Sequence, residues 1–265
     1  MLKLLNTELK VWSKYSQVRW ISFWAMSSII IGPLFLVQLI KKHININEGL
    51  TEITFSFPTV FNSIAIIELL PIQFVSIILI TVVCSDYESD TYKMYLLNGQ
   101  TPTDLWLSKL YLNITSSVLV SAISFLVAIG YGLLFSVTSF EIAFESISYY
   151  LILLFQSFNF FTFAVFVALI FRKTGTSFVF YILWFSILER TVAQIVNYNA
   201  PFYAFPLGSM LPGKSTEDLT IFTALTDHYI KRVGFETERT MAAVFWPIFL
   251  QLISWRLFWI NRDRT

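Results

Sequence analysis

Residues 21–40 read ISFWAMSSIIIGPLFLVQLI, a run without a single charged side chain. A helix needs about 20 apolar residues to cross the hydrocarbon core of a bilayer, because lipid offers no partner to unpaired backbone groups. This stretch therefore predicts a transmembrane helix. The composition of the 265-residue chain agrees, since 56% of the residues are hydrophobic, 13% are charged and the mean hydropathy is +0.67. These values are too apolar for a soluble domain.

Five further apolar segments are long enough to cross a membrane. The expected spans run over residues 21–40, 60–84, 110–135, 147–171, 176–196 and 241–260. Pro71 in the second span predicts a kink or tilt, and Glu189 and Arg190 interrupt the fifth. The phenylalanines at 155–166 are expected to pack inside the protein or against lipid. The predicted fold is an all-α membrane protein with six transmembrane helices in one domain, residues 21–265.

The distribution of basic residues predicts how these helices are oriented. With the N-terminus in the cytoplasm, the inner side carries Lys3, Lys10, Lys14, Arg19, Lys93, Lys109, Arg172, Lys173, Arg262 and Arg264, and the outer side carries Lys41, Lys42, Lys214, Lys231, Arg232 and Arg239. Because Lys and Arg concentrate in cytoplasmic loops, we expect both termini in the cytoplasm. The many Ile, Asn, Lys and Phe residues and the compact loops favour a bacterial inner membrane.

The outer loop over residues 197–240 contains GSMLPGKS at 208–215, which fits the nucleotide-binding pattern G-x-x-x-x-G-K-[ST]. That pattern binds phosphate where a strand leads into the loop and a helix leaves it. The preceding NYNAPFYAFPLG has two prolines and no alternation. We interpret Gly208–Ser215 as a coincidental match in a loop that faces away from cytoplasmic nucleotide.

Composition excludes other classes of function. The net charge of +1 gives no signature of nucleic-acid binding, and two His and one Cys cannot build a metal cluster or an intrachain disulfide. No span carries an H-E-x-x-H motif or a Ser–His or Ser–Lys constellation. We therefore expect no catalytic residue, no metal ligand and no cofactor in this chain.

Residues 1–20 predict a basic amphipathic helix ahead of the first span. On a helical wheel, Lys3, Lys10 and Lys14 share one arc, while Leu5 and Leu9 gather opposite them. Such a helix lies in the membrane interface. It serves either as a surface anchor or as a docking site for a partner.

The inner loop between the second and third spans reads SDYESDTYKMYLLNGQTPTDLWLSK at 85–109. Ser85 can cap a helix with an acidic first turn, and Gly99 can end it, so a helix is expected over about residues 86–98. The run TPTD at 101–104 is a second start signal that leads into the third span. The short acidic helix is either a solvated surface or a surface that docks a protein.

This inner loop resembles that of type-two ABC exporter permeases. The family's E-x-G-T, Leu-Leu, Pro and small-residue-Lys elements correspond in order to Glu88-Ser89-Asp90-Thr91, Leu96-Leu97, Pro102 and Ser108-Lys109. Asp90 stands where the family usually has Gly, and a basic residue common after the Pro is absent, with Asp104 nearby. The layout of an interfacial helix, six spans and a long outer segment is also similar.

The resemblance implies a non-catalytic transport subunit. In that family two permease subunits pair in the membrane, and two soluble ATPases that bind ATP and Mg dock beneath them through the coupling helix. The residues implied to couple to the ATPase are Asp86, Glu88, Asp90, Thr91, Tyr92, Leu96 and Leu97. The substrate would be amphipathic, such as a peptide antibiotic, a lipid or a lipid-linked glycan. A self-contained multi-span membrane enzyme or channel is the alternative.

Two more features lie toward the outer side. The family places re-entrant helices where residues 197–240 alternate short apolar runs with prolines, although a folded loop without a gating role is equally compatible. Glu68, Glu189 and Arg190 are charged residues within the spans, and such residues usually face a partner or a wet cavity. Glu68 pairs with Arg190, or Glu189 and Arg190 end the fifth span at the headgroups.

Overall fold

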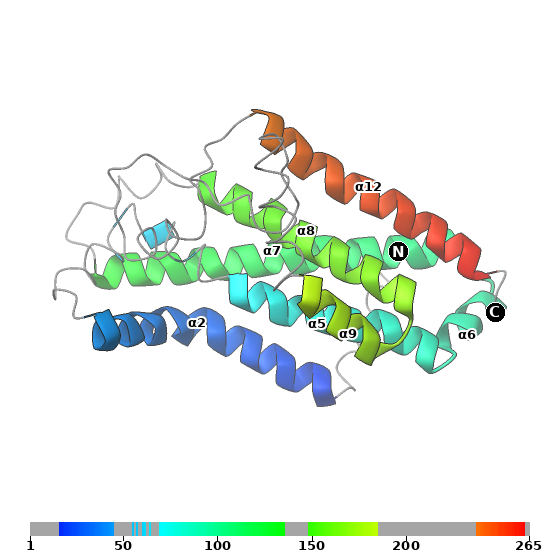
Figure 1. Cartoon of the computed structure of the whole chain (residues 1–265), viewed down its shortest axis with the longest axis horizontal. Helices are drawn as coiled ribbons and strands as arrows, with labels where there is room; N and C mark the ends of the chain where they lie inside the picture. The colour runs from blue at the N-terminus through cyan, green and yellow to red at the C-terminus, as the bar shows by residue number, and fades with distance from the viewer. Residues whose placement is uncertain are drawn as a thin grey trace.

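The computed structural model describes residues 16–44, 69–135, 148–184 and 237–262, together with Phe55, Phe57, Val60, Phe61 and Ile64. Within these residues the regular secondary structure is entirely helical. The helices are α2 (Ser16–Ile44), α5 (Leu69–Glu88), α6 (Thr91–Leu97), α7 (Pro102–Phe135), α8 (Ser148–Phe171), α9 (Thr174–Leu183) and α12 (Thr237–Arg262). Figure 1 shows the long helices running side by side along the long axis of the molecule.

Four of the described helices are long and apolar enough to cross a membrane. Their apolar stretches are Val18–Phe35 in α2, Pro71–Glu88 in α5, Pro102–Phe135 in α7 and Leu153–Phe171 in α8. These confirm the first four expected spans as long apolar helices, although α5 continues to Glu88 and α7 starts at Pro102. Shorter apolar segments, Thr174–Leu183 in α9 and Pro247–Ile260 in α12, occupy the places of the fifth and sixth.

Two sequence predictions fall partly outside the described residues. The structure assigns residues 16–20 to α2, and the remainder of the expected amphipathic helix, residues 1–15, is not described. α5 is described from Leu69, and residues 65–68, which precede it, are not described, so the kink or tilt expected at Pro71 stays a prediction.

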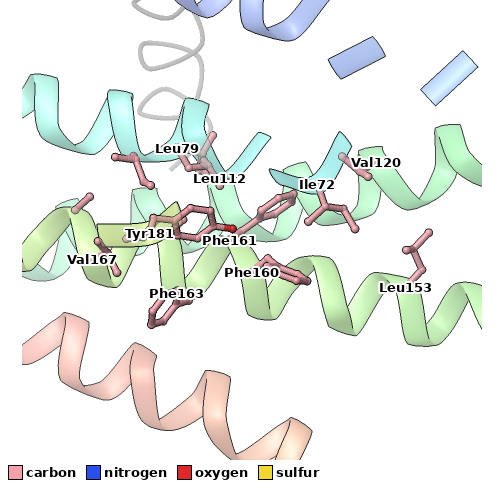
Figure 2. Close-up of a cluster of buried hydrophobic side chains, with 14 of the residues drawn as sticks. Ile72, Leu79, Leu112, Val120, Leu153, Phe160, Phe161, Phe163, Val167 and Tyr181 are labelled. Carbon is pink, nitrogen blue, oxygen red and sulfur yellow. The ribbon is translucent and has the colours of Figure 1, made fainter. Parts of the chain in front are cut away.

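The central helix of the bundle is α8, which packs against α5, α7, α9 and α12. Its Phe160 and Phe161 are fully buried, whereas Phe155 is exposed on the outside of the bundle. Figure 2 shows Phe160 and Phe161 between side chains from neighbouring helices, with Tyr181 of α9 beside them. The phenylalanines thus take both of the expected roles, in packing and on the outer surface.

α2 lies at the side of the bundle and packs against α5 and α7. The hydroxyl of Tyr131 on α7 donates to the carbonyl of Ile30 at 2.7 Å. On the opposite face, Trp20, Phe23 and Trp24 are each more than half exposed. A large exposed apolar face is unusual for a protein surrounded by water, and it suits contact with lipid.

Near the far end of α7, an aromatic cluster packs against a glycine. Phe55 stacks on Tyr131 with ring centroids 5.2 Å apart, and Phe135 lies 5.7 Å from Phe55. A Cβ atom on Gly132 would overlap the ring of Phe57. The absence of a side chain at position 132 is therefore what lets the Phe57 ring approach α7.

Candidate functional site

At one end of the bundle the chain turns from α5 into α6 and then into α7, close to the ends of α8, α9 and α12 (Figure 1). We call residues 85–101 the α5–α6 corner. Asp90 adopts a left-handed conformation with φ 53° and ψ 13°. This conformation interrupts the helix after Glu88 and redirects the chain into α6. Glycine adopts it without cost, and aspartate does so more readily than most other residues.

The prediction of one helix over residues 86–98, capped by Ser85, is wrong. α5 continues through Ser85, whose hydroxyl donates to the carbonyl of Val82 at 2.8 Å. The break comes after Glu88, and α6 has only seven residues. The physical reason is that the helix arriving from the membrane already supplies carbonyl acceptors to the following amides, so no cap is needed at Ser85.

The predicted end of this helix at Gly99 is confirmed. Gly99 has φ 83°, and its amide donates to the carbonyl of Leu96 at 3.1 Å. The amide of Gln100 donates to the carbonyl of Tyr95, also at 3.1 Å. These two hydrogen bonds form a Schellman cap, which needs a left-handed residue and therefore favours glycine.

The second start signal, at 101–104, is also confirmed. The amide of Thr101 donates to Oδ2 of Asp104 at 3.0 Å, and the amide of Asp104 donates to Oγ1 of Thr101 at 3.2 Å. This reciprocal pair is a capping box. With 34 residues, α7 is about 50 Å long and exceeds the hydrocarbon core, so a bilayer cannot cover its whole length. The hydrogen bonds from the Thr101 side chain and backbone lower the pKa of Asp104.

Tyr92 anchors α6 to the last helix. It is 3% exposed, and its hydroxyl donates to the carbonyl of Phe258 on α12 at 2.9 Å. Its ring stacks on Tyr87 of α5 with centroids 4.9 Å apart. The guanidinium of Arg172, in the turn between α8 and α9, lies 5.7 Å from the centre of the Tyr87 ring. A buried hydroxyl with a partner and two stacked rings hold α6 in one position.

A buried ion pair joins α5 to α7. Oδ2 of Asp86 lies 2.7 Å from Nζ of Lys109, and the two side chains are 15% and 5% exposed. Each charge compensates the other for the loss of water, so removing one would leave the second uncompensated. Asp86, expected from the sequence to contact an ATPase, therefore faces the interior of the protein.

Glu88 joins α5 to α9. Its Oε1 accepts a hydrogen bond from the amide of Thr174, the first residue of α9, at 2.7 Å. The residue before it, Lys173, makes no side-chain cap of its own. A carboxylate at the N-terminus of a helix is favourable, because it pairs with a free amide and with the positive end of the helix dipole. Glu88 supplies this cap from another helix.

The outward face of α6 carries an apolar tip formed by Met94 and Leu97. Their side chains are 56% and 81% exposed. Leu96 is partly buried and packs against the core. The Leu-Leu pair identified in the sequence is thus divided, with one side chain turned inward and the other turned outward.

Asp90 and Thr91 lie on the exposed turn before α6. Asp90 makes an ion pair with Lys93 at 3.2 Å, and both side chains are well exposed. The hydroxyls of Thr91 and Ser89 are 2.7 Å apart. Exposed pairs of this kind contribute little to stability, so Asp90 and Lys93 are available to a partner.

Several residues that contact this corner were not identified from the sequence as parts of the site. Thr174 and Phe258 act through backbone atoms, so their residue types carry no signal. Arg172 was counted only as an inner basic residue. Lys109 was identified as part of the Ser108-Lys109 element of the resemblance, but its pairing with Asp86, which follows the predicted span 60–84, was not predicted.

The remaining candidate residues lie outside the described part of the chain. These are Glu68, Glu189, Arg190, the segment Gly208–Ser215 and the outer segment at 197–240. Among the described residues, no group of three or more His, Cys, Asp or Glu could hold a metal ion. The α5–α6 corner is therefore the candidate site that the structure describes in full.

Comparison with known proteins adds no relative. No family model, no curated protein and no solved structure matches this chain. The functional argument therefore rests on the geometry of the α5–α6 corner and on the pattern of apolar helices around it.

Proposed function

We propose that this chain is the transmembrane permease subunit of an ATP-driven exporter of the type-two ABC class. The observation that carries the proposal is the construction of α6. This short helix lies at one end of the bundle (Figure 1), presents Met94 and Leu97 outward, and is fixed to α12 through Tyr92. Such a helix suits a groove on a soluble protein, because its apolar tip gains by being covered.

The connections of the α5–α6 corner suit the transmission of a displacement. Asp86 binds α7, Glu88 binds α9 and Tyr92 binds α12. A partner that pulls or pushes α6 acts on α12 directly through Tyr92, and on α7 and α9 through the end of α5, to which α6 is joined. Movement of packed helices between two arrangements is the common means by which binding at one site changes another.

In this proposal the motor is a separate soluble ATPase that binds ATP and Mg, and the chain itself is not an enzyme. Six transmembrane helices, with both termini in the cytoplasm of a bacterial cell, form the substrate pathway together with a second permease subunit. The substrate is amphipathic, and the outer segment at 197–240 covers the exit. Four long apolar helices, two shorter ones and the corner residues support this arrangement.

The test is whether a neighbouring reading frame encodes a soluble ABC ATPase and whether that ATPase co-purifies with this chain. Met94→Asp combined with Leu97→Asp places two charges on the apolar tip, and we expect loss of ATPase binding with unchanged membrane insertion. Thr176→Asp is the matched control, because Thr176 is exposed in the first turn of α9 at the same end of the bundle. Retained binding in the double variant, or ATP hydrolysis by the purified chain alone, would refute the proposal.

A further inference from the structure

Two amide side chains in the interior of the bundle lack hydrogen-bond partners within the described residues. Asn113 on α7 is fully buried, and neither its Oδ1 nor its Nδ2 is paired. Gln156 on α8 is 1% exposed, and its Nε2 is unpaired. By contrast, the hydroxyls of Ser117 and Ser124 on α7 donate to carbonyls of their own helix at 2.8 Å. Gln73 Nε2, Ser121 Oγ and Ser254 Oγ are also buried without a partner in the described part of the chain, but Asn113 differs from them in that both polar atoms of its side chain are unpaired.

A hydrogen-bonded chain shows that these two residues lie at the same height in the bundle. Nε1 of Trp106 donates to Oε1 of Gln251 at 3.2 Å, and Nε2 of Gln251 donates to Oγ1 of Thr162 at 3.2 Å. Asn113 lies about 10 Å along α7 from Trp106, and Gln156 lies about 9 Å along α8 from Thr162. α7 and α8 pack together and run in opposite directions (Figure 1). Moving forward along α7 from Trp106 and backward along α8 from Thr162 therefore leads the same way along the bundle, and Asn113 and Gln156 lie at a similar height.

The direction of the Asn113 side chain follows from its position on α7. It follows Trp106 by seven residues, which is almost two full turns, so both side chains leave the same face of α7. Trp106 uses that face to reach Gln251, which itself bonds to α8. The Asn113 amide is therefore directed toward the region where α7, α8 and α12 meet.

Buried polar groups in native proteins are almost always paired with protein or with water, because an unpaired group loses its hydration without compensation. The partner of these amides must accept hydrogen bonds from Nδ2 of Asn113 and Nε2 of Gln156 and donate one to Oδ1 of Asn113. It must also be small, since both side chains are enclosed. Water meets all of these conditions.

We propose that Asn113 and Gln156 hold enclosed water between α7 and α8, inside the transmembrane bundle. The proposal does not depend on the exporter function. Polar side chains within membrane-spanning helices usually face a partner or a wet cavity, and both of these side chains are buried.

The experiment is X-ray radiolytic labelling of the purified chain in lipid nanodiscs, in which bound water generates hydroxyl radicals that oxidise adjacent side chains. Phe160 is the reporter, because it lies one turn from Gln156 on the same face of α8. Phe161 is the matched control, because it is equally buried and points to a different face. We expect at least a fivefold higher labelling rate at Phe160 than at Phe161.

The variant Asn113→Leu combined with Gln156→Leu removes the polar walls of the site and should bring labelling of Phe160 down to that of Phe161. Ser117→Ala, which removes an equally buried hydroxyl that bonds to its own helix, should leave the labelling unchanged. The labelling rates of Phe160 and Phe161 are compared first in the unmodified chain, so this part of the test does not depend on whether a variant folds. Equal labelling there, or undiminished labelling of Phe160 in the folded double variant, would overturn the proposal.

Discussion

Replacing Lys109 by Met tests the buried ion pair between α5 and α7. The substitution keeps the length of the side chain and removes its charge, leaving the Asp86 carboxylate without its partner at 2.7 Å. Removing one member of a buried pair typically costs about 3–5 kcal/mol. Because the Asp86 side chain keeps 15% exposure to solvent, we expect the lower end, about 3 kcal/mol.

A loss of about 3 kcal/mol corresponds to a fall in the unfolding midpoint of about 6–12 °C for a domain of this size. The midpoint is measured by intrinsic fluorescence of the detergent-purified chain, for which its 8 tryptophans give a strong signal. The matched control is Lys93→Met, which removes the same charge from the exposed pair with Asp90. An exposed pair contributes at most about 1 kcal/mol, so this control should move the midpoint by about 4 °C or less.

A double variant separates loss of the pair from loss of packing. Asp86→Asn combined with Lys109→Met removes both charges, and replacing both partners of a buried pair is often nearly neutral. We therefore expect the double variant to recover most of the midpoint lost in Lys109→Met. A Lys109→Met midpoint no lower than that of Lys93→Met, or no recovery in the double variant, would contradict the assigned role.

Five further substitutions, at four positions, test other contacts, with the unfolding midpoint as the common measurement. Asp90→Gly should leave the chain as stable or more stable by about 0.5–1 kcal/mol, whereas Asp90→Val should cost about 1–2 kcal/mol, because φ at this position is 53°; equal midpoints would argue against the left-handed turn. Tyr92→Phe should cost about 1 kcal/mol through the lost bond to Phe258 while keeping the stacked ring, and an unchanged midpoint would exclude that bond. Gly132→Ala should cost about 1–3 kcal/mol through overlap with Phe57, and tolerance of the methyl group would show that the ring is not held there. Asp104→Ala should lower the midpoint at neutral pH but have little effect at acid pH, because a carboxyl with a lowered pKa contributes stability above its unfolded pKa and loses it as the pH falls through its folded pKa; an effect that persists when the carboxyl is protonated would refute the capping role.

Local signals predicted the features of this chain that depend on a few neighbouring residues. Apolar runs gave the first four long helices, because the bilayer fixes the length that a helix must reach. Gly99 predicted the end of α6, and Thr101 with Asp104 predicted the start of α7, because both caps are formed by residues within one turn of each other.

The directions of the acidic side chains could not be predicted in the same way. Asp86, Glu88 and Asp90 looked like one acidic surface in the sequence. In the structure Asp86 pairs inside with Lys109, Glu88 caps a distant helix and Asp90 stays outside. The difference is set by partners 23 and 86 positions away in the chain, as Lys109 and Thr174 are, and no local pattern contains them.

The start of α6 was mispredicted for a related reason. Ser85 is a good cap by residue type, but a cap matters only where a helix begins, and α5 passes through this position without a break. The break follows from the left-handed conformation of Asp90. The resemblance to exporter permeases had placed a glycine at this very position, and the observed φ gives a physical reason why a glycine would be favoured there.

The division between inward and outward residues decides which substitutions are informative about docking. Reversing the charges at Asp86, Glu88 and Asp90 together would break a buried ion pair and a helix cap as well as alter the surface, so a loss of transport in that variant would not distinguish a missing contact from a distorted corner. Met94 and Leu97 are well exposed, and charges placed there leave the contacts to α7, α9 and α12 intact. If the corner transmits movement, Leu97→Asp should abolish partner binding and leave the unfolding midpoint unchanged. Lys109→Met should lower the midpoint and reduce partner binding only at temperatures near that lowered midpoint. A chain in which both substitutions lowered stability and binding in parallel would have α6 as part of its folded core, and the separation of anchor from docking surface would be wrong.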